Sequence, residues 1–239
     1  MNFKNKNCVI TGASKGIGKA VAQIIAENNG NLLLLDINEE GLKEVKESIS
    51  NKSINIEIKK VDISDENDVN NTINEYLNRN KKIDVLINNA SIYHNHFSFR
   101  NSESTEWKNK INVNILGTMY MCKAIIENMV SNKYGKIVNI ASVAGVYGDG
   151  GMCDYAMTKG AIISFTKSLA KEVGSLGINV NAVSPGSIDV GAGNLPELSY
   201  LGRSGSVTEC ANVICFLASD DSSYVNGQNY LVDGLRKKI

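Results

Sequence analysis

Short apolar segments alternate with helical patterns along nearly the whole chain, and this alternation restricts the fold more than any other feature. The clearest segment is 31–36, where four consecutive leucines suit a strand buried on both faces of a parallel sheet. Strands that alternate with helices form a doubly wound sheet. We therefore predict an α/β fold in a single domain over residues 1–239, with helices on both faces of a mostly seven-stranded parallel sheet. The expected strands are residues 7–11, 31–36, 54–61, 83–88, 135–140, 178–183 and 229–232.

A glycine-rich loop follows the first expected strand and is typical of dinucleotide binding. Gly12, Gly16 and Gly18 stand between that strand and a helical pattern from Lys19. Glycine lets the backbone pass close to a pyrophosphate, and a helix N-terminus offers free N–H groups with a favourable dipole. A glycine turn that serves only tight packing is the alternative interpretation.

An aspartate at the end of the second expected strand favours NAD over NADP. Asp36 lies roughly twenty residues beyond the glycines, where a carboxylate accepts hydrogen bonds from an adenosine ribose and repels a 2′-phosphate. Lys15 is the only cation nearby. The alternative is that Asp36 caps a helix over 39–50.

Other polar or small residues also follow expected strands directly, and the carboxyl ends of parallel strands meet at one edge of a sheet. Asp62 either bonds an adenine amino group or caps a helix that begins near Glu66. The small residues of 89–91 permit close approach to a ribose. Ser142 and the segment 185–188 follow two later strands, so we expect all of them at the same edge.

A tyrosine and a lysine four residues apart supply the candidate acid–base group. Tyr155 and Lys159 share one face of an expected helix over 155–176. A free tyrosine titrates near ~10, and an adjacent ammonium lowers the pKa of a phenol toward the range useful in proton transfer. The alternative is an exposed, solvated lysine. The same helix has a wide apolar face, which needs a partner within the fold or from another subunit.

A long helix is expected over 105–129, with Asn114 inside it. Asparagine competes for backbone hydrogen bonds and is a poor residue for a helix interior. Either a local kink that holds a water or simple exposure explains its presence. Thr208 is the expected N-cap of a later helix over 208–218.

Charge and composition exclude several classes of function. Lys and Arg total 25 and balance 25 Asp and Glu, so no basic field indicates nucleic acid or an anionic membrane. No apolar run approaches the ~20 residues of a membrane span, and the N-terminus does not read as a signal peptide. Five scattered cysteines indicate reduced thiols in the cytoplasm. His94 and His96 suggest a solvated loop, so no metal site is expected, and the tail 236–238 is interpreted as solvated charge.

These motifs together resemble the short-chain dehydrogenase/reductase family, in the family's order and over almost the whole chain. The matching residues are Thr11-Gly12-Ala-Ser-Lys-Gly16-Ile-Gly18, Asn88-Asn89-Ala90, Asn114, Ser142, Tyr155-x-x-x-Lys159 and Pro185-Gly186. The resemblance implies a Rossmann-like domain, an alcohol or ketone substrate and a homotetramer or homodimer that pairs the helices around 105–130 and 155–175.

The resemblance also implies residue roles. Tyr155 exchanges the proton at the substrate oxygen, Ser142 hydrogen-bonds that oxygen, Lys159 holds the nicotinamide ribose, and Asn114 anchors a water that links Lys159 to solvent. The residues expected at the dinucleotide, with NAD preferred to NADP, are Gly12, Ser14, Lys15, Gly16, Ile17, Gly18, Asp36, Asp62, Ile63, Asn89, Ala90, Tyr155, Lys159, Pro185, Gly186 and Ile188.

Some positions depart from the family pattern. Ser91 and Leu235 each replace a glycine, and Val190 replaces a threonine that bonds the nicotinamide carboxamide. The segment 190–202 is shorter than the usual substrate lid. Three functions stay open: an NAD-dependent alcohol dehydrogenase or ketone reductase, a 3-oxoacyl-carrier-protein reductase, and a catalytically weak dinucleotide sensor or scaffold.

Overall fold

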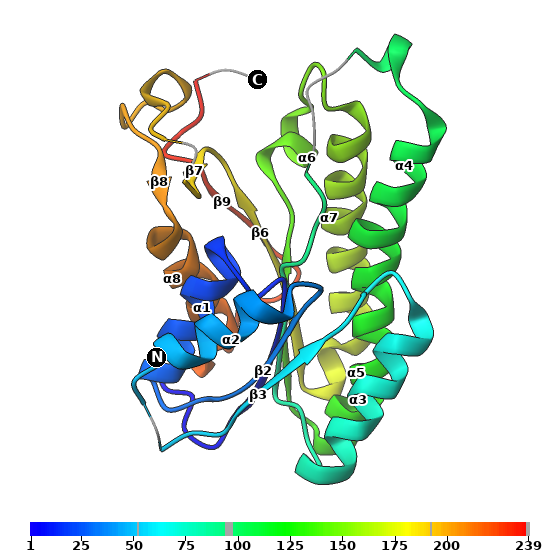
Figure 1. Cartoon of the computed structure of the whole chain (residues 1–239), viewed down its shortest axis with the longest axis vertical. Helices are drawn as coiled ribbons and strands as arrows, with labels where there is room; N and C mark the ends of the chain where they lie inside the picture. The colour runs from blue at the N-terminus through cyan, green and yellow to red at the C-terminus, as the bar shows by residue number, and fades with distance from the viewer. Residues whose placement is uncertain (52, 94–97, 192, 238–239) are drawn as a thin grey trace.

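The computed structural model describes residues 1–51, 53–93, 98–191 and 193–237, and its centre is one parallel sheet of seven strands. The strand order is β3-β2-β1-β4-β5-β6-β9 (Figure 1), so the winding reverses between β1 and β4, where ligands of doubly wound sheets bind. This arrangement confirms the predicted fold. The strands are β1 (Asn7–Thr11), β2 (Asn31–Asp36), β3 (Ile56–Lys60), β4 (Val85–Asn88), β5 (Gly135–Ile140), β6 (Ile178–Pro185) and β9 (Asn229–Val232).

Helices cover both faces of this sheet (Figure 1). One face carries α1 (Gly16–Glu27), α2 (Glu39–Ser48) and α8 (Val207–Ala218). The other carries α3 (Glu66–Asn80), α4 (Ser104–Lys110), α5 (Thr118–Asn132) and α7 (Cys153–Val173), and the short α6 (Val143–Tyr147) packs against α7.

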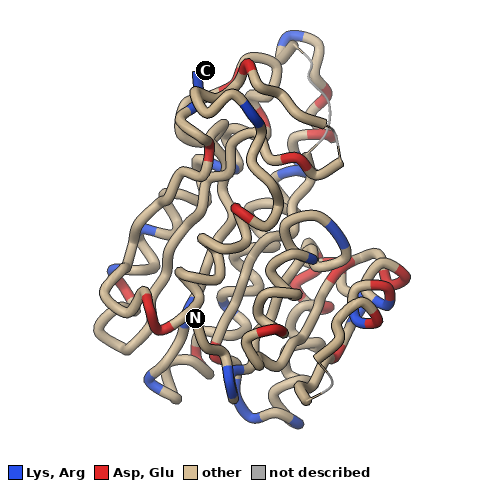
Figure 2. Tube along the Cα trace, turned by 90° about the vertical axis from the view of Figure 1, so that its left-hand side faces the viewer, with Lys and Arg blue, Asp and Glu red and all other residues tan. Residues whose placement is uncertain are grey.

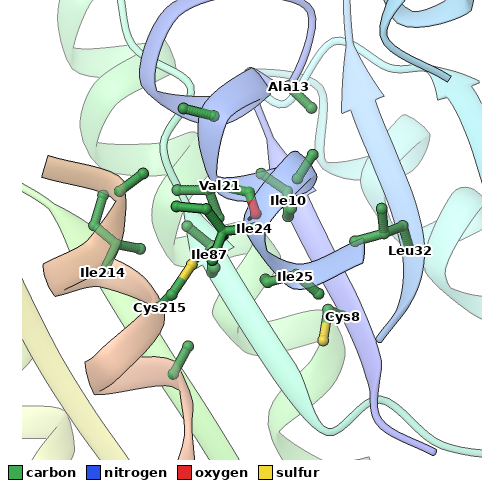
Figure 3. Close-up of a cluster of buried hydrophobic side chains, with 14 of the residues drawn as sticks. Cys8, Ile10, Ala13, Val21, Ile24, Ile25, Leu32, Ile87, Ile214 and Cys215 are labelled. Carbon is green, nitrogen blue, oxygen red and sulfur yellow. Dashed lines mark hydrogen bonds between the residues drawn. The ribbon is translucent and has the colours of Figure 1, made fainter. Parts of the chain in front are cut away.

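Two apolar cores lie on the two sides of the sheet because strand side chains alternate between its faces. The four leucines of β2 divide accordingly: Leu32 and Leu34 join one cluster, and Leu33 and Leu35 join the other. In the first cluster α1 and α8 meet, with Val21 and Ile24 beside Ile214 and Cys215 (Figure 3). The apolar face of α7 is covered in part within the chain: Leu169 and Val173 belong to the second cluster, and the partly buried Phe165 packs against it.

The expected helix over 105–129 is interrupted. Between α4 and α5 the segment Ile111–Gly117 is a π-helix, and Asn114 at its centre is fully buried. Simple exposure of Asn114 is therefore wrong, and a local distortion is correct. Gly117 closes the segment against Ile63, whose Cδ1 would lie 2.7 Å from any Cβ placed there.

The N-cap predicted at Thr208 is wrong, and so are the alternative interpretations of Asp36 and Asp62 as N-caps. Helix α8 is capped by Ser206 rather than Thr208, in a reciprocal capping box with Glu209. Asn38 caps α2 and Asp65 caps α3, so neither Asp36 nor Asp62 serves as an N-cap.

Two further strands were not expected, β7 (Ile188–Asp189) and β8 (Gly205–Ser206), which pair with each other beside the main sheet. The expected strands 54–61 and 83–88 are shorter than predicted, and the strand that starts at 178 is longer.

Charged residues of both signs are interspersed along the chain (Figure 2), in keeping with a formal net charge of +0. Within the described residues, no helix combines the length and the apolar character that a membrane crossing requires.

Candidate active site

A cavity of about 640 Å³ opens at the carboxyl edge of the sheet, where the loops after several strands meet. Tyr155, Lys159 and Ser142 line it together, although they come from two different elements. Of the residues expected at a dinucleotide, those on the wall are Ile17, Asn89, Tyr155, Lys159, Pro185, Gly186 and Ile188.

The three catalytic candidates converge around the phenol of Tyr155. Ser142 follows β5, and its Oγ accepts from the amide of Ala144 at 3.2 Å. Lys159 lies one turn further along α7, with its Nζ 5.6 Å from the centroid of the Tyr155 ring. The same Nζ donates to the carbonyl oxygen of Ile140 at 2.8 Å. A hydroxyl, a phenol and an amine therefore face one cavity.

Burial favours the neutral forms of both Tyr155 and Lys159. It raises the pKa of Tyr155 to about 12, against the hydrogen bond from Ser142, which lowers that pKa. It lowers the pKa of Lys159 to about 7. The expectation that Lys159 brings the Tyr155 pKa down is wrong for the chain by itself, because the penalty for burying charge exceeds any attraction between the two groups.

Asn114 lies behind the site: it is not one of the described residues that line the cavity. Its Oδ1 accepts from the amide of Ile92 at 2.7 Å, and its Nδ2 donates to the Ile92 carbonyl and to Thr158 Oγ1, both at 3.1 Å. Asn114 thus joins the π-helical segment to α7 and to the chain after β4.

The glycine loop packs directly on the chain that follows β4. Gly12 has φ +65°, and a Cβ there would lie 2.7 Å from Ala90 Cα. A Cβ on Gly18 would lie 2.2 Å from the carbonyl oxygen of Gly12. The side chain of Asn89 donates to that same oxygen at 2.9 Å. Tight packing therefore explains Gly12 and Gly18, whereas Gly16 needs glycine for its φ of +56° in otherwise open space.

Thr11, the last residue of β1, makes a contribution that the sequence did not show. Its Oγ1 accepts from the amides of Asn89 and Ala90, both at 3.0 Å. It thereby fixes the distance between β1 and the chain after β4.

The N-terminus of α1 fits a pyrophosphate. Lys15 occupies the N-cap position and makes no side-chain cap hydrogen bond, so its side chain takes none of the first-turn amides. These amides lie at the positive end of a 12-residue helix, the arrangement that binds phosphate in many proteins.

Asp36 is held in place at the end of β2 by two backbone amides. Its Oδ2 accepts from the amide of Ser14, and its Oδ1 from the amide of Asn38, both at 3.0 Å. The side chain stays partly exposed at the end of β2. The residues present therefore fit a dinucleotide.

Asp62 and Ile63 are less directly placed. Asp62 Oδ1 accepts from the amide and the hydroxyl of Ser64, at 2.9 and 2.7 Å. The side chain of Ile63 is buried against Gly117. Contacts of these two residues with a cofactor stay predictions, as do those of all the other residues expected at the dinucleotide.

The chain after β4 contributes an aromatic wall. The ring of Tyr93 lies edge-on to that of Tyr155, with centroids 5.2 Å apart. His94 and His96 lie outside the described residues. Within the described part, no group of three or more His, Cys, Asp or Glu side chains could hold a metal ion.

The C-terminal tail reaches the cavity, which corrects its interpretation as solvated charge. Arg236 lines the wall, is 14% exposed, and pairs with Asp149 at 3.3 Å. Backbone hydrogen bonds join Tyr200 to Leu235 and Lys237 to Leu198, so the tail holds the short lid segment. Leu235, which replaces a family glycine, adopts a φ of +59°.

Val190 also lines the cavity, 60% exposed. Its Cγ1 is the nearest group to the open side of Gly16.

A doubly wound sheet with a glycine loop at its switch point and a Ser–Tyr–Lys cluster beside it defines an oxidoreductase that works with a dinucleotide. Comparisons with known proteins agree. A family model described as short chain dehydrogenase matches residues 6–195. This chain therefore belongs to the short-chain dehydrogenase family.

Individual relatives match over their full length. The 3-oxoacyl-[acyl-carrier-protein] reductase FabG of Chlamydia pneumoniae is 34% identical over 238 residues, which cover 96% of each chain. The structure of an NAD+-bound xylitol dehydrogenase gives a TM-score of 0.91 at 31% identity and covers 98% of this chain and 100% of that one. A 3-ketoacyl-(acyl-carrier-protein) reductase from Brucella melitensis complexed with NADH gives 0.91 at 27% identity and covers 98% of both chains.

Proposed function

We propose that this protein interconverts a secondary alcohol and a ketone, with NAD as the hydride carrier and Tyr155 as the general acid–base. One observation carries the proposal: Ser142, Tyr155 and Lys159 converge on the wall of a cavity that Ile17 and Asn89 of the dinucleotide edge also line. NAD, when bound, would supply or accept the hydride.

Each side chain has a role in this proposal. The Tyr155 hydroxyl gives a proton to the ketone oxygen in reduction and takes it back in oxidation. Ser142 donates a hydrogen bond to the same oxygen and stabilises the developing alkoxide. Lys159 holds the nicotinamide ribose, and Asn114 fixes the segment that packs behind it.

The cofactor residues follow from the loops around the cavity edge. The amides of the first turn of α1 would bind the pyrophosphate, and Asp36 would accept from the adenosine ribose and disfavour a 2′-phosphate. We therefore propose NAD as the preferred cofactor.

The test is Tyr155→Phe, which removes one hydroxyl and keeps the ring. Turnover of an alcohol or ketone substrate should fall by at least about 100-fold, since general acid–base groups contribute that much or more. NADH binding, measured by fluorescence titration, should survive. Turnover that is unchanged in the variant would remove the assignment of Tyr155.

A second candidate function is the reduction of a 3-oxoacyl thioester on a carrier protein. The full-length similarity to the FabG protein of Chlamydia pneumoniae favours it. NADH preference does not exclude it, because the related Brucella reductase was solved with NADH. Assays with a 3-oxoacyl thioester and with a panel of alcohols and ketones, each with both cofactors, separate the two. A catalytically weak sensor is disfavoured by the complete set of Asn114, Ser142, Tyr155 and Lys159.

We also propose a homodimer or homotetramer in the cytoplasm. The apolar face of α7 is covered only in part within the chain, so it still offers apolar surface to a partner subunit. Met119 on α5 and Met157 on α7 stay 41% and 49% exposed and are the apolar side chains that a partner subunit would cover.

A further inference from the structure

The helix that carries Tyr155 begins without a side-chain cap. Met152 stands at its N-cap position and makes no side-chain cap hydrogen bond, so the first-turn amides need other acceptors. The amide of Tyr155 finds one in its neighbour: Asp154 Oδ1 accepts from it at 2.7 Å. A carboxylate thus replaces the missing cap for the residue whose phenol faces the cavity.

The other oxygen of this carboxylate is held from a different element. Lys110, the last residue of α4, donates from Nζ to Asp154 Oδ2 at 2.6 Å. Both side chains are only 4% exposed. A carboxylate removed from water needs a charged partner, and Lys110 supplies it. The ion pair therefore offsets the cost of burying the Asp154 carboxylate, whose other oxygen accepts from the first turn of α7.

A second contact runs parallel to the first. Asn114 Nδ2 donates to Thr158 Oγ1 at 3.1 Å, and that hydroxyl donates to the Tyr155 carbonyl at 2.8 Å. Lys110 and Asn114 are four residues apart, and so are Asp154 and Thr158. Two successive contacts thus join the segment 110–114 to the first turns of α7, and both end on the backbone of Tyr155.

We propose that Asp154 is a positioning residue for the reaction, which holds the Tyr155 phenol in register with Ser142 and the cavity, and that Lys110 balances its buried charge. This inference rests on the proposed function of Tyr155. The ion pair by itself would be an expensive way to stabilise the fold, because well-packed apolar residues of similar size often replace a buried pair without loss of stability. The acceptor that Asp154 presents to the Tyr155 amide has no apolar substitute.

Two double variants separate positioning from stability. Lys110→Met with Asp154→Asn removes both charges but keeps an acceptor oxygen for the Tyr155 amide. Lys110→Met with Asp154→Leu removes the charges and the acceptor. The control, Lys59→Met with Glu75→Leu, removes a lysine–carboxylate pair of 3.1 Å between β3 and α3.

The Leu variant should lose kcat by about 10- to 100-fold with KM changed less than about threefold, because a displacement of about 1 Å at a reacting group has effects of this size. The Asn variant should stay within about threefold of the unmodified protein, and the control should match it. Midpoints of thermal unfolding, measured alongside, show that all variants are folded. Equal kcat in the Asn and Leu variants, whether both high or both low, would overturn the inference.

Hydrogen exchange at the Tyr155 amide tests the same contact without activity. Exchange should be faster in the Leu variant than in the Asn variant, and equal rates would also overturn the inference. If Tyr155→Phe keeps full turnover, the proposed function fails first, and the exchange result alone then shows whether the acceptor oxygen at position 154 orders the first turn of α7.

Discussion

At the scale of single residues, the proposed preference for NAD depends on the charge of Asp36 rather than on shape. Its two oxygens already accept from the amides of Ser14 and Asn38, so the carboxylate cannot swing away from an incoming phosphate without losing both bonds. A 2′-phosphate placed there would meet a fixed negative charge. A ribose hydroxyl would meet an acceptor.

We predict that NADH binds at least about tenfold more tightly than NADPH, since a hydrogen bond to a charged group contributes about 1.5–3 kcal/mol. Asp36→Ala should narrow this ratio. Asp36→Asn should narrow it while keeping more NADH affinity, because an amide oxygen can still accept from Ser14 or the ribose. Fluorescence titrations with both cofactors measure the ratio, and equal affinities in the unmodified protein would contradict the role of Asp36.

The residue scale also shows where the sequence is informative about the site. Tyr155, Lys159, Ser142 and the glycine loop were predictable because each follows a strand or shares a helix turn, which are local relations. The pairing of Lys110 with Asp154 was not, since 44 residues separate them and only the crossing of α4 with α7 brings them together. The pKa of Tyr155 was also unpredictable from spacing, because it depends on how much water the folded chain excludes.

At the scale of elements, strands were predicted better than helix ends. Strands of a parallel sheet are continuous apolar runs, and four of them, including β1 and β2, begin and end at the predicted residues. Helix caps depend on which of several nearby hydroxyls turns back toward the helix. Ser206 and Thr208 are two residues apart, and the sequence alone did not distinguish them.

We predict that Ser206→Ala lowers the free energy of unfolding by about 1 kcal/mol, the usual cost of losing an N-cap. Ser206 Oγ accepts from the Glu209 amide at 3.1 Å, and the Glu209 carboxylate accepts from the Ser206 amide at 2.8 Å. Hydrogen bonding to Arg203 holds the pKa of Glu209 at about 2, so this contact persists at acidic pH. Thr208→Ala is the matched control and should cost much less. Urea unfolding at fixed protein concentration compares them, and a larger loss for Thr208→Ala would contradict the assignment.

At the scale of the whole molecule, the sheet brings buried ionisable groups to one edge. Their burial lowers the free energy of unfolding by an amount that depends on pH. Lys159 has a pKa of about 7 in the folded chain, well below the value of 10.5 for a free lysine. Between these values the unfolded chain binds the proton more strongly than the folded one. Stability contributed by this group therefore rises as pH increases from 7 toward 10.5 and is lowest below 7.

Lys159→Met removes this titration. We therefore expect the unfolding free energy of the unmodified protein to increase relative to that of the variant as the pH rises from 7 to about 9.5. A change of about 2–3 kcal/mol is expected over that range, because one unit of pKa shift corresponds to about 1.4 kcal/mol. The buried thiols, whose pKa values are raised by burial, lower stability at high pH in both proteins and cancel in the difference. Lys167→Met, which removes an exposed lysine from the same helix, should give a flat difference. A flat difference for Lys159→Met as well would show that solvent reaches Lys159 in the folded protein, and burial would then not lower its pKa.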